Sequence, residues 1–311
     1  MKKENYTTTV IGHKAPDSDS MCSAIAYAGL LNMLGTKAEA VCASKTNKET
    51  KFILDYLDLK EPPVITDTEN RIFVLVDHSS YSLAYEGVNE SNVIEVIDHH
   101  DPGDIINDKI KSTINKVGAC ATLIYEKYKE ADVSIDKTDA ALLLSGILSD
   151  TSNMNRNVTE KDRKAYEELE KSSGIENIDA YYAQMEEARL SYEGMSDYGI
   201  FMNDYKEYEI GPVSYGLVSL ALRKEEGVEE LLDKMKIVMD EYYDELKKDY
   251  LFAKLGILEN SHTYMIANNE EAKEVLLKSL VLEDKGDYLF TDKEMSRKKV
   301  IVPAINKYIE K

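Results

Sequence analysis

The chain is poor in several residue types, and each shortage excludes a class of protein. Only 15 of its 311 residues are glycine and 6 are proline, too few for a fibrous or largely disordered protein. The three cysteines, Cys22, Cys42 and Cys120, are odd in number and widely spaced, which predicts reduced core thiols and no disulfide framework. We therefore expect a soluble globular protein of the cytoplasm.

Long apolar runs are also missing. No segment approaches the roughly 20 consecutive apolar residues that a membrane-spanning helix needs. The first eleven residues carry charges and threonines and are followed by polar residues, unlike the apolar stretch of a signal peptide. The sequence therefore predicts no membrane partner and no secretion.

Positive charge is scarce. The 38 lysines and arginines are outnumbered by 58 aspartates and glutamates, which gives a formal net charge of −20. A protein of this sign repels nucleic-acid backbones and anionic headgroups at long range. We therefore expect no nucleic-acid partner, and a phosphate ligand would have to be captured by local charge or by a metal ion.

What the chain does contain is enough apolar sequence, 43%, for packed cores, and a length that indicates two domains. In its first half, short β-branched runs alternate with longer periodic segments. This alternation predicts an α/β domain with a parallel sheet that is covered on both faces. The predicted strands are 8–11, 38–42, 72–76 and 93–97, and the predicted helices are 21–34, 49–57, 120–129, 139–149 and 160–171.

The pattern loosens at residues 191–195, where we place a linker between a domain of residues 1–190 and a smaller domain of residues 196–311. In the second domain, apolar residues recur at helical spacing from Val228 to Leu246 and predict one long amphipathic helix. The strands predicted there are 213–220, 250–258, 264–267 and 299–302.

Histidine is rare, but four of the five histidines stand near aspartates within the first hundred residues. His13, the pair Asp77-His78 and the triplet Asp98-His99-His100 each follow a predicted strand. The carboxyl ends of neighbouring parallel strands meet at one edge of a sheet, where ligands bind. We therefore expect these side chains to converge.

Two further elements add carboxylates to this edge. The loop 12–20 carries His13, Asp17 and Asp19 immediately before a predicted helix, although either aspartate alone could be a helix cap. Asp150 ends an apolar helix, where its charge opposes the helix dipole unless a cation lies nearby. Carboxylates and imidazoles without thiolates favour magnesium or manganese, with cobalt or zinc as alternatives.

Two divalent ions a few ångströms apart can activate a water and stabilise a displacement at phosphorus. The charge of such a pair would be balanced by four carboxylates, those of Asp17, Asp19, Asp77 and Asp150. A polyphosphate would then need further cations. The segment Ser296-Arg297-Lys298-Lys299 is the candidate, since arginine can bind two phosphate oxygens at once, although a short basic run is more often a solvated face.

These motifs together resemble the DHH phosphoesterase superfamily and, more narrowly, the family II, manganese-dependent inorganic pyrophosphatases. The resemblance extends from about residue 8 to residue 304. It implies an N-terminal parallel-sheet DHH domain that binds metal and catalyses, and a smaller C-terminal α/β DHHA2 domain with a mixed sheet that binds substrate. The segments that carry it are 12–20, Asp98-His99-His100, 118–122, Ser149-Asp150-Thr151 and 296–299.

The resemblance implies that pyrophosphate is hydrolysed to two phosphates by water activated at two manganese ions. Magnesium or cobalt are alternative metals, additional magnesium is expected with the substrate, and family members are commonly homodimers. The implied metal ligands are His13 and Asp17 for one ion, Asp19, His99 and Asp150 for the other, and Asp77 as the bridge. The implied catalytic residues are Asp77 and the substrate-contacting His100, Arg297 and Lys298. Asp98 is expected to orient an imidazole.

The chain departs from the family where substrate is bound. Residues 149–159 lack the lysine and proline usual in that loop, and Arg156 is the candidate replacement. Ser79 and Val300 stand where asparagine and glutamine are common. Two alternatives therefore stay open: an exopolyphosphatase acting on longer chains, and a prune-like or regulatory protein. The sequence assigns no role to His262.

Overall fold

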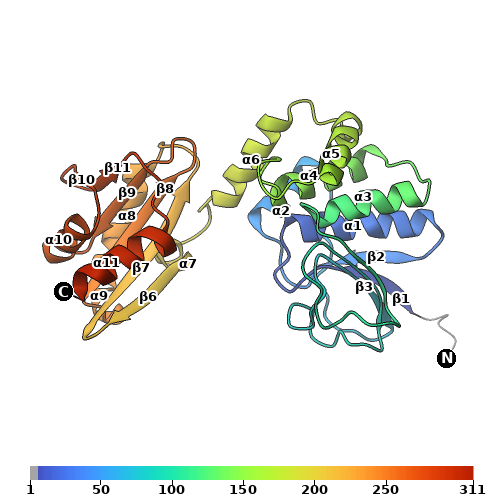
Figure 1. Cartoon of the computed structure of the whole chain (residues 1–311), viewed down its shortest axis with the longest axis horizontal. Helices are drawn as coiled ribbons and strands as arrows, with labels where there is room; N and C mark the ends of the chain where they lie inside the picture. The colour runs from blue at the N-terminus through green and yellow to red at the C-terminus, as the bar shows by residue number, and fades with distance from the viewer. Residues whose placement is uncertain (1–5, 311) are drawn as a thin grey trace. The chain divides into compact units, whose positions relative to one another are not determined.

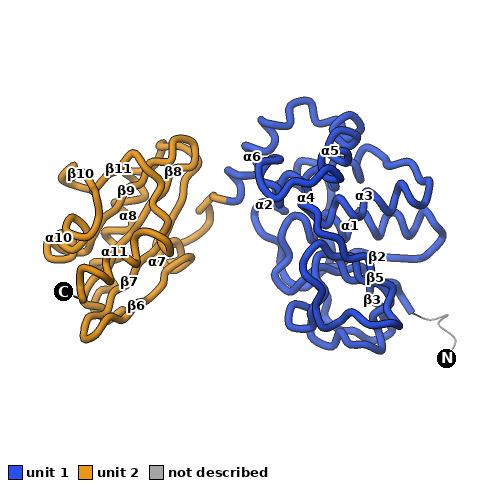
Figure 2. The backbone as a smooth tube through the Cα atoms, in the orientation of Figure 1, with its two compact units in different colours: residues 1–189 blue, residues 190–311 orange. Residues whose placement is uncertain are grey.

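The computed structural model describes residues 6–310 and divides into two compact units, residues 1–189 and residues 190–311 (Figure 2). Each unit has a sheet and helices of its own (Figure 1). The predicted α/β class with two domains is confirmed. No helix within the described residues combines the length and the apolar character needed to cross a membrane.

The first unit is built on a five-stranded parallel sheet in the order β2-β1-β3-β4-β5. Its central strands are β-branched and buried, as expected for a parallel sheet covered on both faces. The edge strand β5 was not predicted, because its side chains are polar and mostly at the surface. The strands are β1 (Thr7–Ile11), β2 (Ala38–Val41), β3 (Arg71–Val76), β4 (Val93–Asp98) and β5 (Lys111–Ile114).

Helices cover one face of this sheet: α1 and α3 pack directly on the strands, and α4 packs against α1 and α3 (Figure 1). The other face is covered by irregular chain, which contributes buried side chains such as Ala84 and Ile105. The helices are α1 (Ser18–Met33), α2 (Lys48–Tyr56), α3 (Cys120–Glu130), α4 (Lys137–Asp150), α5 (Glu160–Ser173) and α6 (Ile178–Leu190).

The second unit is built on a six-stranded mixed sheet in the order β10-β11-β9-β8-β7-β6. Only β7 and β8 run parallel, and the other neighbours are antiparallel. One face packs against α8, and the other against α10 and α11. The strands are β6 (Tyr205–Ile210), β7 (Val213–Leu222), β8 (Tyr250–Ile257), β9 (Thr263–Ala267), β10 (Glu283–Asp284) and β11 (Leu289–Thr291).

Two local predictions for this unit are wrong. The strand expected at 299–302 is helical: a π-helix (Arg297–Ile301) leads directly into α11. Ile301 and Ile305 stand one helical turn apart and are both fully buried, so this β-branched run packs as one face of a helix. The long helix expected from Val228 to Leu246 is split at Tyr242. The helices of the unit are α7 (Asp197–Asn203), α8 (Val228–Glu241), α9 (Tyr243–Leu246), α10 (Glu270–Ser279) and α11 (Val302–Ile309).

Candidate metal centre

Three neighbouring strands of the first unit deliver side chains to one edge of its sheet. His13 lies two residues beyond β1, Asp77 directly follows β3, and His99 directly follows β4. The strands stand in the order β1-β3-β4, so their carboxyl ends are adjacent. Residues that are 64 and 86 positions apart from His13 along the chain are thereby brought within a few ångströms of one another.

The ligand atoms of this edge fall into three overlapping groups, and within each group they lie within 4.8 Å of one another. Side chains from β1, β3, β4, α1 and α4 all contribute. The groups are His13, Asp17 and Asp77; Asp19, His99 and Asp150; and Asp77, His99 and His100.

Asp77 stands at the middle of the cluster. Its Oδ2 lies 3.4 Å from His13 Nε2, and its Oδ1 lies 3.2 Å from His99 Nε2. The residue is 2% exposed and takes the left-handed φ of 62°, a region that aspartate tolerates better than most side chains. Because burial would otherwise oppose ionisation, the neighbouring His13 and His99 are what hold the pKa of this carboxyl down to about 2.

His99 is oriented by the main chain. Its Nδ1 lies 3.1 Å from the carbonyl oxygen of Val117, which can only accept, so Nδ1 carries the proton of that hydrogen bond. In the neutral ring, Nε2 then presents a lone pair. Nε2 is buried without a hydrogen-bond partner and lies 3.5 Å from Asp150 Oδ2. A histidine that binds metal through Nε2 requires this tautomer and this ring orientation.

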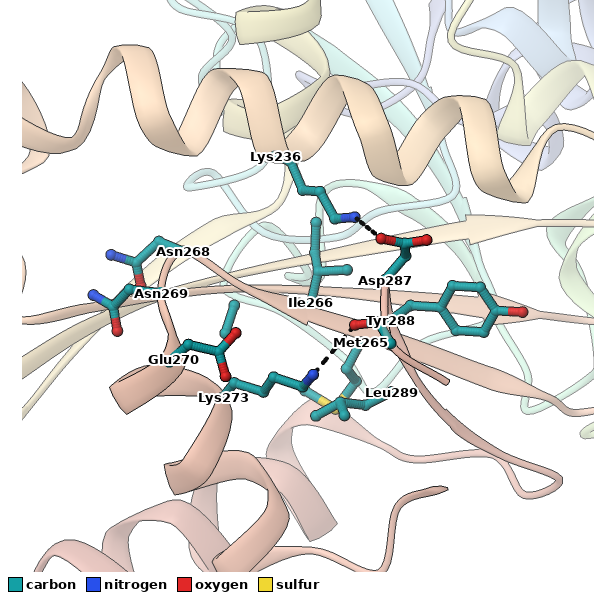
Figure 3. A pocket seen from close by; sticks show the side chains of 12 residues that line it. Lys236, Met265, Ile266, Asn268, Asn269, Glu270, Lys273, Asp287, Tyr288 and Leu289 are labelled. Carbon is teal, nitrogen blue, oxygen red and sulfur yellow. Dashed lines mark hydrogen bonds and ion pairs between the residues drawn. The ribbon is translucent and has the colours of Figure 1, made fainter. Parts of the chain in front are cut away.

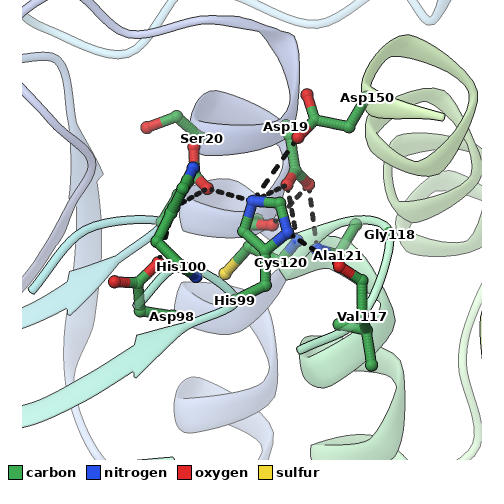
Figure 4. A network of polar contacts seen from close by, with 12 residues as sticks. Asp19, Ser20, Asp98, His99, His100, Val117, Gly118, Cys120, Ala121 and Asp150 are labelled. Atoms are coloured by element: carbon green, nitrogen blue, oxygen red, sulfur yellow. Dashed lines mark hydrogen bonds and ion pairs between the residues drawn. The ribbon is translucent and has the colours of Figure 1, made fainter. Parts of the chain in front are cut away.

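Asp19 is fully buried and is held by backbone amides at the start of α3 (Figure 4). Its Oδ2 accepts a hydrogen bond of 2.5 Å from Cys120 N, and its Oδ1 accepts one of 2.9 Å from Ala121 N. Gly146 of α4 makes the close approach of the helices feasible, because a Cβ there would lie 2.8 Å from Asp19 Oδ1. The carboxylate is thus fixed before any ligand arrives.

Asp17 and Asp150 complete the cluster from two helix ends. Asp17 is the N-cap of α1 and accepts a hydrogen bond of 2.9 Å from Ser20 N through Oδ1, while its Oδ2 lies 3.6 Å from His13 Nε2. The cap and the cluster therefore use different oxygens of one carboxylate. Asp150 ends α4, and burial together with the carboxylates of Asp17 and Asp77 raises its pKa to about 7.

The electrostatics of the cluster fit a bound cation. Burial by itself lowers the pKa of His13 and of His99, but the surrounding carboxylates raise both to about 10. Burial and the charges of Asp150 and Asp77 also raise the pKa of Asp19 well above its usual range. Without a cation, these groups hold protons to offset their mutual repulsion. Hard carboxylates, imidazoles and an orphaned buried nitrogen therefore form a donor set that fits manganese.

His100 differs from His99 in being open to solvent, with 60% of its side chain exposed. Its backbone N–H and Nδ1 both donate to Asp98 Oδ1, at 3.1 and 2.9 Å. The hydrogen bond to Asp98 raises the pKa of the imidazole, so Nε2 can also carry a proton. The expectation that Asp98 orients an imidazole is confirmed.

The remaining predicted site residues are not members of these ligand groups. Arg156 is exposed on the turn after α4. Arg297 lies in the second unit, where it donates to Asp204 at 2.5 Å to the carbonyl oxygen and 2.7 Å to Oδ1, and Lys298 beside it is exposed. His262 lies 2.6 Å from Glu225 and packs edge-on against Phe290, so it has a structural contact of its own.

Sequence reasoning missed Glu49. This carboxylate is 4% exposed on α2 and accepts hydrogen bonds of 2.8 Å from both Ser18 and Ser149, which flank the metal cluster. It ties the start of α1 to the end of α4 and so supports Asp19 and Asp150. Nothing in the local sequence distinguishes it from an ordinary first-turn glutamate, because its partners are 31 and 100 residues away.

A hollow of about 260 Å³ in the second unit has no comparable chemistry (Figure 3). Its two lysines are already paired, Lys236 with Asp287 at 4.0 Å and Lys273 with Asp284 at 3.0 Å. The lining offers no imidazole and no converging carboxylates. The edge of the first sheet is therefore the stronger candidate for a catalytic centre.

The parallel-sheet unit, with aspartates and histidines at its carboxyl edge, and the mixed-sheet unit that follows it each match a known family. The DHH family, N-terminal domain, matches residues 7–147, and the DHHA2 domain matches residues 183–308. Both halves of the predicted resemblance are confirmed.

Sequence identity to individual proteins identifies a narrower family. The chain is 30% identical to a manganese-dependent inorganic pyrophosphatase of Methanothrix thermoacetophila, over 97% of this chain and 98% of that protein. It is 31% identical to the manganese-dependent inorganic pyrophosphatase of Bacillus subtilis, over 95% of this chain and 96% of that protein. The chain belongs to the family of manganese-dependent inorganic pyrophosphatases.

Solved structures agree with this assignment. A Methanococcus jannaschii structure assigned to the family II inorganic pyrophosphatases matches with a TM-score of 0.61 and 26% identity, covering 97% of this chain and 99% of that one. An exopolyphosphatase-related protein of Bacteroides fragilis matches with a TM-score of 0.51 and 14% identity, covering 98% and 93%, and shares the fold.

Proposed function

We propose that this protein is a metal-dependent hydrolase that cleaves inorganic pyrophosphate to two phosphates, with manganese as its metal. The observation that carries the proposal is the convergence of His13, Asp77 and His99 from three strand ends with carboxylates from two helices. Full-length similarity to manganese-dependent inorganic pyrophosphatases supports the same reaction over the exopolyphosphatase and regulatory alternatives.

The three ligand groups support a division of roles for two ions. In this proposal, His13 and Asp17 would hold the first ion, Asp19, His99 and Asp150 would hold the second, and Asp77 would serve both. The metal, when bound, would lower the pKa of a water to make it a nucleophile and would offset charge on the phosphates. Magnesium and cobalt are alternative metals, and further magnesium would accompany the substrate.

The chain's own groups would bind the phosphates and move the proton. Because Asp98 holds Nδ1 of His100, the exposed Nε2 side is left to donate to a phosphate oxygen. Arg297 and Lys298 would add positive charge to the substrate, and the planar guanidinium can contact two oxygens at once. Arg156 is exposed and is our candidate for a further phosphate contact.

In the same proposal, residues 1–190 are the catalytic domain, residues 196–311 bind substrate and residues 191–195 link them. We also propose that the enzyme works in the cytoplasm as a homodimer. Sedimentation of the purified chain tests the oligomeric state directly, and a monomer at micromolar concentration would contradict it.

A substrate panel tests the reaction. Full-length protein is stripped with a chelator and reloaded with manganese or magnesium, and phosphate release is followed from pyrophosphate and from tripolyphosphate. We expect the stripped protein to be inactive, manganese to restore activity and pyrophosphate to be the preferred substrate. A clear preference for tripolyphosphate would instead identify an exopolyphosphatase, and no release from either would favour a regulatory protein.

A further inference from the structure

One face of the second sheet is apolar at one end of its strands and carries small or charged residues at the other. Residues two apart on a strand share a face, so Phe252, Lys254 and Gly256 of β8 point to the same side. Phe252 lies in the core cluster that packs with α10 and α11, but neither Lys254 nor Gly256 belongs to it. Beyond Phe252, this face of β8 therefore carries a lysine and a glycine in place of apolar side chains.

The neighbouring strands also carry small residues on this part of the face. Ser219 of β7 is the register partner of Lys254, and Ala221 is that of Gly256, which pairs on its other side with Thr263 of β9. Apart from Lys254, all of these side chains are small. On β9 the register partner of Lys254 is the larger Met265, so the small side chains lie around the ammonium end of the lysine, beside Gly256, and not around its base.

Gly256 has a specific relation to this lysine. A Cβ at position 256 would collide with Lys254 Nζ, so the ammonium lies over the backbone of Gly256. The side chain thus runs along the sheet toward the carboxyl end of β8. The missing side chain at position 256 is what allows this course.

Arg297 lies near Lys254, on the same face of the sheet. The segment before it is fixed at β9, where Thr263 Oγ1 donates to the carbonyl oxygen of Lys293 at 2.9 Å. The guanidinium is fixed beside β7, because Asp204, its partner, accepts a hydrogen bond of 3.3 Å from Ser219 N. Since β8 lies between β9 and β7, the path to the guanidinium crosses over the strand that carries Lys254.

The two cations differ in how they are neutralised. Arg297 is paired with Asp204 at 2.7 Å. Among residues 6–310, none forms a hydrogen bond or ion pair with Lys254, whose nearby charges are Glu294, Arg297 and Asp204. Burial lowers the pKa of the Lys254 ammonium, which is the response of a partly buried cation that lacks a close partner. Glu294 is exposed and therefore well screened by water.

We propose that Lys254 binds a phosphate group of the substrate beside Arg297, as a substrate-binding residue of the second unit. This inference rests on the proposed function and adds a residue to it. A partly desolvated, unpaired ammonium next to an arginine is a site for an anion with several oxygens, because one oxygen can accept from each cation. Pyrophosphate has this form.

The test compares two lysines of similar burial. Lys254→Met removes the unpaired ammonium and keeps an unbranched chain of similar length. Lys248→Met is the matched control, since Lys248 is also partly buried but is paired with Glu207 at 2.7 Å. For each full-length, manganese-loaded protein, KM for pyrophosphate is measured, together with the Kd of methylenediphosphonate, a non-hydrolysable probe, by calorimetry.

We expect Lys254→Met to weaken binding of the probe and raise KM by about 10-fold to 100-fold, the loss typical of a hydrogen bond to a charged group. Lys248→Met should leave both within about twofold of wild type. Lys254→Gln is a second variant in case the methionine variant fails to fold, which circular dichroism would reveal. Wild-type affinity in a folded Lys254 variant would overturn this inference alone, whereas a wild-type protein that does not cleave pyrophosphate would contradict the proposed function itself.

Discussion

The two units hold their charged groups in opposite ways. The first unit buries its acids and fixes them with short contacts, as in Asp19 between two backbone amides and Asp77 between two imidazoles. The second unit places its cations on long side chains, and only Arg297 among its proposed substrate-binding residues is paired. A centre that holds metal ions needs ligands fixed in advance, whereas phosphate oxygens can be met by flexible ammonium groups.

This contrast also explains how a chain with a net charge of −20 can bind a polyanion. The acids of the first unit become ligands of the cations that fit there, so they no longer repel phosphate. The lysines and arginine of the second unit add a local positive field. Substitutions in either unit can test this contrast. They follow in order of expected effect, from the largest to the smallest.

The largest effect is expected from Asp77→Asn, which removes a charge at the centre of the first unit. Asparagine tolerates the left-handed backbone at this position, so the fold should be kept. We expect turnover to fall by roughly 100-fold to 1,000-fold, the range for loss of one group that stabilises charge in a transition state. Steady-state kinetics with saturating manganese measure this, and the exposed Asp101→Asn is the control. Near-normal turnover would refute a bridging role for Asp77.

The second prediction concerns Asp139, a buried acid of the first unit that lies outside the metal cluster, and asks whether its burial lowers the stability of the fold when it is ionised. Asp139 is 8% exposed and accepts a hydrogen bond of 2.5 Å from Tyr128. Burial raises its pKa from 3.8 to about 6, with a further contribution from Asp136 and against the effect of Tyr128. A pKa that is higher in the folded state means that stability is fully present below the unfolded value and is lost as the pH rises through about 6.

Asp139→Asn should remove this dependence. The difference in free energy of unfolding between wild type and the variant should change by roughly 2 kcal/mol between about pH 4 and pH 7. Urea denaturation of metal-free protein across this range provides the measurement. Asp132→Asn, at an exposed position in the loop between α3 and α4, is the control. A pH-independent difference would show that Asp139 titrates normally.

The smallest effect is expected from Arg297→Ala in the second unit. It should raise KM for pyrophosphate by about tenfold with a smaller change in kcat, because a contact to substrate is lost while the metal ligands remain. Lys299→Ala, an exposed neighbour, should change neither value. Unchanged kinetics in Arg297→Ala would mean that its pairing with Asp204 is its whole role.

Much of the first unit could be predicted because its signals are local. Buried β-branched runs mark β1, β3 and β4, and each is followed within two residues by a histidine or an aspartate. The edge strands β5 and β6 could not be found, since exposed polar strands lack the apolar pattern. The run 299–302 was misjudged because four β-branched and basic residues are too short to separate helical from strand periodicity.

The types of metal-binding residue were also predictable, but their supports were not. Glu49 binds serines 31 and 100 residues away, and Arg297 binds Asp204 across 93 residues. Such pairs are set by tertiary packing and leave no trace in neighbouring sequence. The same holds for Lys254, whose ammonium lies over Gly256, between small side chains of the two adjacent strands.

The way Asp19 is held has a consequence for how the protein can change over evolution. Its closest donors are the main-chain amides of residues 120 and 121, which every amino acid except proline provides. Substitution there by any residue other than proline can alter size but leaves the donors in place. Mutations that abolish metal binding should therefore fall mainly on the aspartates and histidines of the cluster.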